Sequence, residues 1–424
     1  MLRKYINKTY IYTITLIIIL FSFITAYSQD EFSAGSPYNI YGLGDYIYSS
    51  SIRTDAMGIQ GIALYGDYVN NMNPASNSRL SFTNLTASAE YYLQKSSDNN
   101  ISSRFSDLNV NGFNIGIPFS QNNGWVLTLG FNPITNINYK ITNQAYSNGV
   151  PYKKNFYGSG GLSRINAGMS YKVFKVLTLA AEYNYAFGNK VDLKYYNFNT
   201  SGFINTYQKY QNNFDGSYFK AGFIFDAGSF FKSDLINNLA IGFIYQTKCK
   251  LYSTYETITG SSIGFDTTSV SDYYNISFPE AFGFGITNKF GQRFLMSADL
   301  LIQQWSKFSV ANVKQENYQD AYRFGIGFEI QPPNRSDRTV LEDLTYRFGF
   351  FYDRSYFKIN NDNINRYGIT AGINIPLYGD NSIDISLSYY IRGSRNNGLI
   401  QDENFRIAAG LNFGELWFIK AREE

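Results

Sequence analysis

Short segments in which large apolar residues alternate with small or polar ones recur from about residue 80 to the end of the chain. Residues 383–389 (Ile-Asp-Ile-Ser-Leu-Ser-Tyr) show the pattern most cleanly. Further examples lie at residues 125–131, 177–187, 239–246, 322–330, 367–375 and 405–413. Because successive side chains of a β-strand point to opposite faces, each segment predicts a strand with one apolar face and one small or polar face.

The composition indicates what covers the apolar faces. In a soluble β-sandwich the second face would be rich in charged residues, but only 16% of this chain is charged, against roughly 25% in a typical soluble domain. Aromatic residues make up 18% of the chain, with 38 Tyr and 36 Phe. This balance is typical of a barrel whose apolar side chains face lipid. We therefore predict an all-β fold, a transmembrane antiparallel β-barrel of about 14 strands spanning residues 81–424.

The first 28 residues have the three regions of a secretory signal peptide. Arg3, Lys4 and Lys8 precede an apolar run at residues 11–24, which ends in the small-residue site Ala26-Tyr27-Ser28. A membrane-spanning helix needs about 20 apolar residues, and this run is shorter. The sequence thus predicts a signal peptide at residues 1–28 and, with the barrel, a multi-pass protein of the Gram-negative outer membrane.

Removal of the signal peptide leaves a chain without net charge. The signal holds three of the 36 Lys and Arg residues and none of the 33 Asp and Glu residues, so 33 of each sign remain. Nucleic acid is therefore not expected as a partner, because its main electrostatic attraction is absent. The expected surroundings are outer-membrane lipid and a hydrophobic small-molecule ligand, with the protein acting as a monomer.

The residues that most enzymes use are missing. The chain has no His, which removes Ser-His and Cys-His nucleophile systems and every His-containing zinc site. Cys249 is the only cysteine, so no disulfide can form within the chain. We expect no enzymatic activity, no metal and no cofactor, although a Ser-Lys or carboxylate site stays open on the sequence alone.

Residues 29–80 do not alternate and contain many glycines, followed by Asn-Pro-Ala at residues 73–75. Backbone polar groups cannot face lipid unpaired, so this segment has to lie in the periplasm or inside the barrel. A hatch or plug inside the lumen is the simpler placement. The domain prediction is therefore a signal peptide, a plug at residues 29–80 and a barrel from residue 81.

At this point the motifs resemble those of a known family, the FadL/TodX family of outer-membrane transporters. The matching stretches are residues 56–63 (Ala-Met-Gly-Ile-Gln-Gly-Ile-Ala), Gly66-Asp67, residues 73–75, Phe278-Pro279-Glu280, residues 305–308 (Trp-Ser-Lys-Phe) and residues 346–355. They follow the order in which that family carries them. Residues 140–270 match only in strand period, and residues 36–45 (Ser-Pro-Tyr-Asn-Ile-Tyr-Gly-Leu-Gly-Asp) are not typical, which suggests a divergent branch.

The resemblance assigns a hatch motif to six residues. They are Gly58, Gly61, Asp67, Asn73, Pro74 and Ala75. For Asn73 we favour a structural role, in which its side chain fixes the hatch to the barrel wall, over direct contact with a ligand. The two glycines are expected to allow close backbone packing in a crowded lumen.

The family also implies a function, passive uptake of hydrophobic compounds such as long-chain fatty acids through a plugged barrel. In that family a kinked strand opens the barrel wall, and Pro133 is our candidate for such a kink because proline cannot donate to a strand ladder. A plain strand end at a turn is the alternative. Ligand-binding residues are not assigned. The inward charges Glu182, Arg323, Glu329, Arg347 and Arg406 could pair across the lumen or meet a ligand carboxylate, and we favour pairing because it is the usual outcome for buried charges.

Two other functions remain open. The chain could be a FadL-fold binding or shuttle component of a protein secretion system (PorV-like), with secretion proteins as partners. A conspicuous platform beside a lumen without an apolar groove would favour that reading. It could also be a sealed structural barrel.

Overall fold

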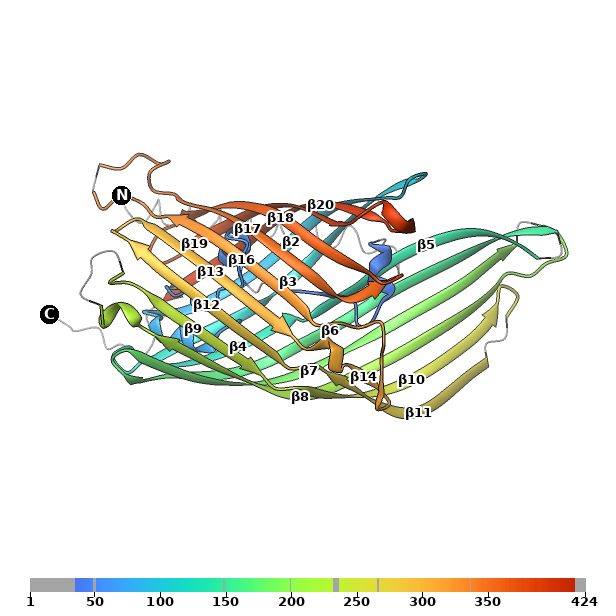
Figure 1. Ribbon diagram of the computed structural model, residues 1–424, viewed down its shortest axis with the longest axis horizontal. Helices are drawn as coiled ribbons and strands as arrows, with labels where there is room; N and C mark the ends of the chain where they lie inside the picture. Colours follow the sequence, from blue (N-terminus) through green and yellow to red (C-terminus); the bar gives the residue numbers. More distant parts are fainter. Residues whose placement is uncertain are drawn as a thin grey trace, which may run out of the picture.

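The computed structural model describes residues 35–48, 51–147, 149–198, 200–231, 236–264, 267–335 and 337–415. A single sheet of antiparallel strands curls into a barrel (Figure 1). The predicted signal peptide at residues 1–28 lies outside the described residues. The same holds for residues 29–34 of the predicted plug.

Fourteen strands form the barrel wall, and the last pairs with the first to close it. Three of the fourteen are broken into two labelled pieces: β4/β5, β9/β10 and β11/β12. The bounds are β2 Thr83–Ser97, β3 Ser102–Ser120, β4 Trp125–Pro133, β5 Thr135–Ser147, β6 Val150–Phe174, β7 Leu177–Phe198, β8 Thr206–Phe225, β9 Ala240–Gln246, β10 Cys249–Ser261, β11 Thr267–Phe278, β12 Ala281–Phe290, β13 Phe294–Gln303, β16 Ala321–Ile330, β17 Thr345–Ile359, β18 Asp362–Pro376, β19 Ser382–Gly393 and β20 Gln401–Glu415. This confirms the predicted all-β barrel of about 14 strands.

The strands alternate as the sequence predicted. On β16, Phe324 and Phe328 point outward and are 41% and 46% exposed, while Arg323 and Glu329 point inward and are buried. An apolar outer surface of this kind suits hydrocarbon, and the closed ladder leaves few backbone groups unpaired there. Within the residues described here, no helix has the length and apolar character needed to cross a bilayer.

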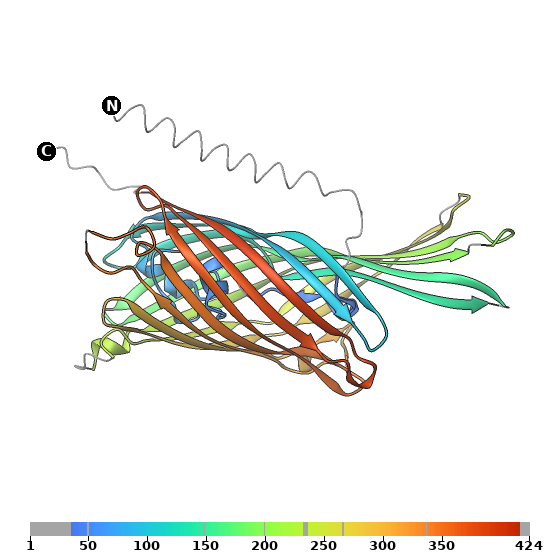
Figure 2. The same ribbon diagram turned by 90° about the horizontal axis from the view of Figure 1, so that it is seen from above.

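Part of the wall continues well beyond the rest of the barrel (Figures 1 and 2). β6 has 25 residues and β7 has 22, whereas β16 has ten. On β7 the outward side chains change from aromatic at Phe187 to polar at Asn189. The outward residues of the neighbouring β8 change likewise from Phe219 to Asp215. The strands β5 to β8, with β10 and β11, therefore extend past the apolar band at one end of the barrel. We call this extended part the projecting sheet.

The N-terminal segment, residues 35–80, lies inside the ring of strands (Figure 2). It contains the short elements η1 Pro37–Ile40, β1 Asp45–Tyr46, α2 Ile52–Ala56 and η2 Pro74–Arg79. Other short elements lie in the loops: η3 Ala227–Ser229, η4 Trp305–Lys307, β14 Ser309–Val310, β15 Val313–Lys314 and η5 Asn396–Gly398. Most residues of the N-terminal segment are buried.

Candidate functional site

The helix α2 is short and held at both ends. The Ser51 side chain accepts a hydrogen bond from the backbone N–H of Thr54, which caps the first turn. The helix ends at Ala56, and Gly58 then adopts a φ of +66° while its N–H donates to the Asp55 carbonyl. A positive φ is unstrained in glycine, so Gly58 lets the chain turn sharply at the end of the helix, where a Cβ atom would lie 3.1 Å from the Phe350 backbone of β17.

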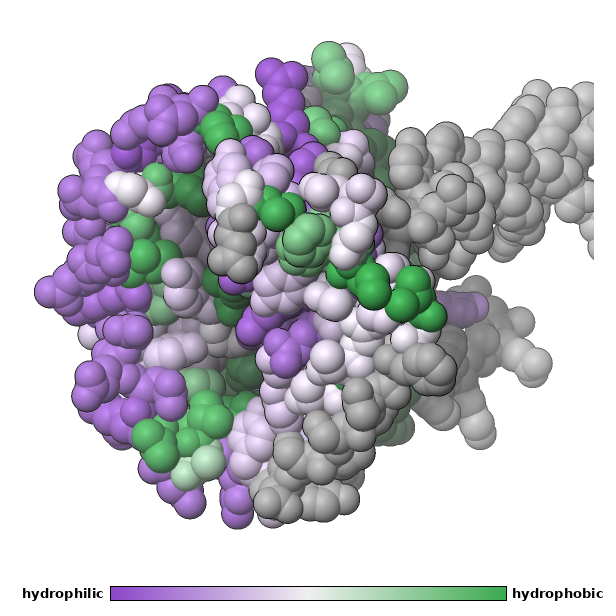
Figure 3. Space-filling view, turned by 90° about the vertical axis from the view of Figure 1, so that its right-hand side faces the viewer, coloured by the Kyte–Doolittle hydropathy of each residue, from purple (hydrophilic) through white to green (hydrophobic). Residues whose placement is uncertain are grey.

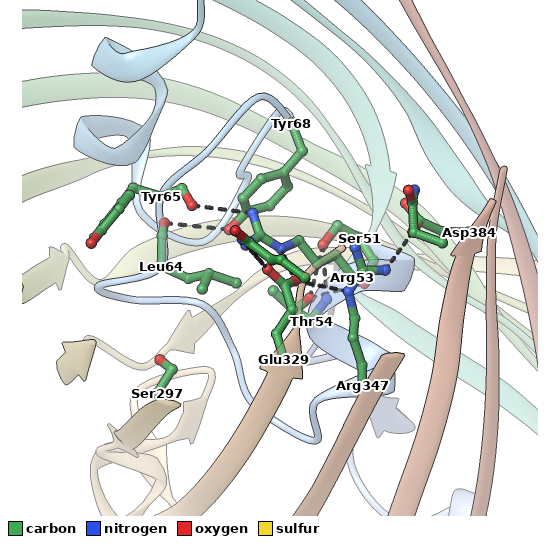
Figure 4. A network of polar contacts seen from close by, with 12 residues as sticks. Ser51, Arg53, Thr54, Leu64, Tyr65, Tyr68, Ser297, Glu329, Arg347 and Asp384 are labelled. Atoms are coloured by element: carbon green, nitrogen blue, oxygen red, sulfur yellow. Dashed lines mark hydrogen bonds and ion pairs between the residues drawn. The ribbon is translucent and has the colours of Figure 1, made fainter. Parts of the chain in front are cut away.

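Arg53 forms a two-pronged ion pair with Glu329 on β16 (Figure 4). The Nε–Oε2 and Nη2–Oε1 distances are 2.7 and 2.8 Å, and the side chains are 10% and 2% exposed. Arg347 on β17 donates to the same carboxylate over 2.9 Å and also contacts Asp384 on β19. Burial alone lowers the pKa of the Arg53 guanidinium, but attraction to Glu329 outweighs it and raises the pKa above its usual value. The pair therefore stays charged inside the barrel.

A second ion-pair group holds the other side of α2. Arg406 on β20 contacts Asp55 over 3.0 Å and Glu90 on β2 over 2.9 Å. Asp55 is buried, and a carboxylate removed from water needs a partner of this kind. The five inward charges predicted from the sequence all take part in ion pairs: Arg406 and Glu329 as described, Arg347 with both Glu329 and Asp384, Arg323 with Asp353, and Glu182 with Lys220. The predicted pairing is confirmed.

Asp299 on β13 binds the backbone of the N-terminal segment. Its Oδ2 atom accepts hydrogen bonds from the N–H groups of Gln60, Gly61 and Ile62, over 2.5 to 3.2 Å. Three successive N–H groups form a concave anion site, and the φ of +83° at Gly61 helps to shape it. This contact of Asp299 was not predicted, because nothing in a strand pattern reveals a backbone partner in a distant loop.

The Asn-Pro-Ala turn contacts the wall at β8. The amide of Asn73 donates to the carbonyls of Ile62 (2.6 Å) and Phe223 on β8 (3.2 Å), and its oxygen accepts from the Ala75 N–H (3.0 Å). Pro74 is the first residue of η2 and Ala75 is fully buried. Asp67 accepts a hydrogen bond from the Ser81 N–H over 2.8 Å. The six predicted hatch residues thus lie in the N-terminal segment, in or next to its contacts with the wall.

The barrel wall splits next to Pro133. β4 ends at this residue, and β5 begins at Thr135 with its edge turned toward β1 of the N-terminal segment. β3 pairs with β4 only from Phe113 onward. In the described part of the chain, β5 from Ile137 to Ser147 pairs with β6 alone. The backbone edges of β3 and β5 therefore separate beyond Pro133, and a side-chain hydrogen bond of 2.8 Å from the Asn138 amide to Asp107 bridges them.

A cavity of about 340 Å³ occupies the split. Its lining residues are Ile47, Asn109, Val110, Pro133, Thr135, Asn136, Gly160, Gly161, Ser163, Phe187, Gly188 and Asn189. A smaller cavity of about 30 Å³ on the lumen side shares Ile47 and Pro133 with it. These two residues therefore stand between the opening in the wall and the interior.

A glycine leaves part of the cavity lining without a side chain. Gly161 has a φ of +140°, and a Cβ atom there would lie 2.3 Å from the Thr135 carbonyl oxygen. No side chain fits at this position without a shift of β5. At this position the cavity is consequently lined by the backbone of β6 instead of by a side chain.

The axis of the barrel is filled on the side of the projecting sheet. A cluster of buried apolar residues from the wall, the N-terminal segment and the loop after β13 meets there. Trp305 is completely buried and its ring stacks on Tyr356 with centroids 4.1 Å apart. Figure 3 looks at the barrel from this end and shows side chains packed across its middle. The wall cavity is thus not continuous with an open axial path through this cluster.

At the other end of the lumen lies a polar cavity of about 560 Å³. Arg53, Asp67, Glu329, Arg347 and Asp384 are among its lining residues. The ion-pair group of Arg53, Glu329 and Arg347 therefore faces this opening.

Comparisons with known proteins place the fold. The BamG family model matches residues 10–423. No curated protein sequence matches the chain. The toluene transporter TbuX of Ralstonia pickettii has a similar structure, with a TM-score of 0.59 and 15% identity, covering 86% of this chain and 98% of that one.

Two further solved structures agree with it. A FadL homologue of Pseudomonas aeruginosa gives a TM-score of 0.61 at 11% identity, covering 88% of this chain and 99% of its own. The toluene transporter TodX of Pseudomonas putida gives 0.57 at 15% identity, covering 87% and 98%. The resemblance to FadL and TodX noted in the sequence is confirmed at the level of the fold.

Proposed function

This chain belongs to the BamG family, and we propose that it is an outer-membrane channel through which hydrophobic small molecules pass passively by way of the barrel wall. The observation that carries the proposal is the split beside Pro133, where a cavity adjoins the apolar outer surface. Proteins of similar structure to this chain include transporters of toluene. Long-chain fatty acids and aromatic hydrocarbons are the first compounds to test.

The physical argument rests on where a hydrophobic molecule is stable. Apolar solutes leave water for hydrocarbon, so a route between lipid and lumen needs an opening in the wall rather than a water-filled axis. Phe131 and Phe187 lie beside the split with ring centroids 6.3 Å apart. They give the outer surface an apolar approach to the cavity. Ile47 and Pro133, which also line the inner cavity, would have to move for passage.

The N-terminal segment acts in this proposal as a plug fixed to the wall. Asp299 and Glu329, on the paired strands β13 and β16, hold it on one side, and Asn73 binds the Phe223 carbonyl on β8. Small displacements near Ile47, rather than expulsion of the whole plug, are then the economical way to open a path.

The test is transport into proteoliposomes whose outer leaflet is lipopolysaccharide, with labelled oleate and labelled toluene. Val110 lines the cavity and is 58% exposed, so Val110→Trp should fill the split and reduce uptake strongly. Leu108 lies two residues away on the same outward face, outside the cavity lining, so Leu108→Trp is the matched control. Equal uptake by wild type, Val110→Trp and protein-free liposomes would overturn the proposal.

A second candidate function, binding of another protein, is favoured by the projecting sheet. Beyond Asn138, whose carbonyl accepts from the Asn39 amide, residues 139–147 of β5 have a single partner strand in the described ladder, so their second edge is able to accept a strand from another chain. Native mass spectrometry of protein released from membranes distinguishes the two functions. A bound lipid supports the channel. A stoichiometric second polypeptide that is lost on Asn143→Pro, a substitution within that edge, supports protein binding.

A further inference from the structure

The cavity in the split lies at the boundary between two environments. Phe187 belongs to the apolar outer band, and Asn189, two residues along β7 on the same face, begins the polar part of the strand. Both line the cavity. A ligand held there would therefore have its apolar part beside lipid and its other part at the height of polar side chains. The volume of the cavity, about 340 Å³, is within the usual range of small-molecule sites, about 300–1,000 Å³.

Three side-chain amides line this cavity without a partner of their own. Asn109 on β3, Asn136 on β5 and Asn189 on β7 come from three different strands. Within the described residues, none of the three side-chain amides makes a hydrogen bond to the protein. Each amide offers two donors and one acceptor oxygen. Hydrogen-bonding groups thus converge on the cavity from both sides of the split.

No charged side chain lines the cavity. The two cations next to cavity residues in the sequence belong to the lumen face and are already engaged there. Arg164, next to Ser163, donates to the Asn71 carbonyl, and Lys190, next to Asn189, donates to the Ile40 and Gly42 carbonyls. On β3, Asp107 lies two residues before Asn109 and adds negative charge nearby. An ionised carboxylate would therefore enter the cavity without a counter-charge, which is costly away from water.

From this lining we infer that the wall cavity binds amphipathic lipids with an uncharged, hydrogen-bonding head, such as an alcohol, ester or amide, in preference to free fatty acids or plain hydrocarbons. The inference deepens the proposed function and rests on it. The amides of Asn109, Asn136 and Asn189 hold the head, and Val110, Pro133 and Phe187 contact the first part of the chain. A plain hydrocarbon leaves the amides unsatisfied, and a carboxylate lacks a cation.

The experiment compares ligands with one hydrocarbon chain and different heads. Binding of oleyl alcohol, monoolein, oleate and octadecene to the purified protein in nanodiscs is measured by competition with a fluorescent C18 alcohol. The expected order places the alcohol and monoolein ahead of oleate and octadecene. Asn189→Leu should weaken binding of the alcohol roughly three- to tenfold, the effect of one net hydrogen bond, and leave octadecene unchanged.

The control is Asn213→Leu, because Asn213 on β8 stands directly opposite Asn189 in the register but outside the cavity lining. Asn109→Leu serves as a second variant should Asn189→Leu fail to fold. Equal or tighter binding of oleate, or loss of alcohol binding in Asn213→Leu as large as in Asn189→Leu, overturns the inference. In that case transport blocked by Val110→Trp would still uphold the channel, whereas transport unaffected by Val110→Trp would overturn the proposed function.

Discussion

Arg53 of α2 and Glu329 of β16 are separated by 276 positions in the sequence and joined by two hydrogen bonds inside the barrel. The same carboxylate also receives Arg347. One acidic side chain of the wall thus compensates two buried cations, one from the N-terminal segment and one from the neighbouring strand. The attachment of the N-terminal segment depends strongly on this carboxylate.

Glu329→Gln should loosen the plug and lower the stability of the folded barrel. Removal of one partner from a buried ion pair leaves uncompensated charge and costs about 3–5 kcal/mol. The measurement is urea unfolding of the refolded protein in lipid, followed by tryptophan fluorescence. Glu342→Gln is the control, because Glu342 pairs with Arg335 in an exposed loop, where such a pair contributes about 0–1 kcal/mol. Equal losses in both variants would contradict the assigned role.

Asp299→Asn should free the turn at residues 60–62 without opening the barrel. The substitution removes the charge that accepts three backbone N–H groups, and a hydrogen bond to a charged group contributes about 1.5–3 kcal/mol. Hydrogen exchange resolved by mass spectrometry should show faster exchange of the Gln60, Gly61 and Ile62 amides. The exposed Asp215→Asn on β8 provides the comparison. Unchanged protection of residues 60–62 in Asp299→Asn would show that the turn is held by other contacts.

Pro133→Val should reduce uptake of a labelled fatty acid in proteoliposomes. Valine restores a backbone donor at the point where β4 ends, and this allows the strand to continue along β3 and narrow the split. Pro118→Val is matched to it, because Pro118 lies on β3 within the paired region opposite Val126. If uptake is the same for Pro133→Val and wild type, Pro133 is only a strand end and the gating role fails.

Trp305→Ala should destabilise the filled end of the lumen. Trp305 is fully buried and stacks on Tyr356, and truncation of a buried aromatic residue costs about 3–5 kcal/mol. Trp125→Ala on the outer surface, where Trp125 is 46% exposed, should cost clearly less. Thermal unfolding followed by circular dichroism tests the difference. A smaller loss for Trp305→Ala than for Trp125→Ala would contradict the packing described here.

Much of the barrel was predictable from local pattern alone. The alternation at residues 322–330 fixes which side chains face lipid, because strand geometry has a period of two. It also identifies Arg323 and Glu329 as inward charges, and buried charges require partners. The identity of those partners was not predictable, since Arg53 and Asp353 come from elements whose neighbours are set by the closed sheet and the plug.

The wall cavity could not be predicted from the sequence for a similar reason. Asn109, Asn136 and Asn189 lie in three separate polar stretches, each of which reads as an ordinary strand or loop. Only the break between β4 and β5 brings them to one opening. Pro133 marked the position of the break, but a proline alone does not distinguish a kinked strand from a strand that ends.

The path of a ligand through the wall is tested most directly by photo-crosslinking. A photoreactive C18 alcohol is bound to the protein in nanodiscs, activated by light and mapped by mass spectrometry of peptides. The account predicts labels concentrated at residues 109–110, 133–136 and 187–189, and their loss in Val110→Trp. Labels confined to the cluster around Trp305 and Tyr356, or spread evenly over the lipid-facing strands, would contradict a route through the split.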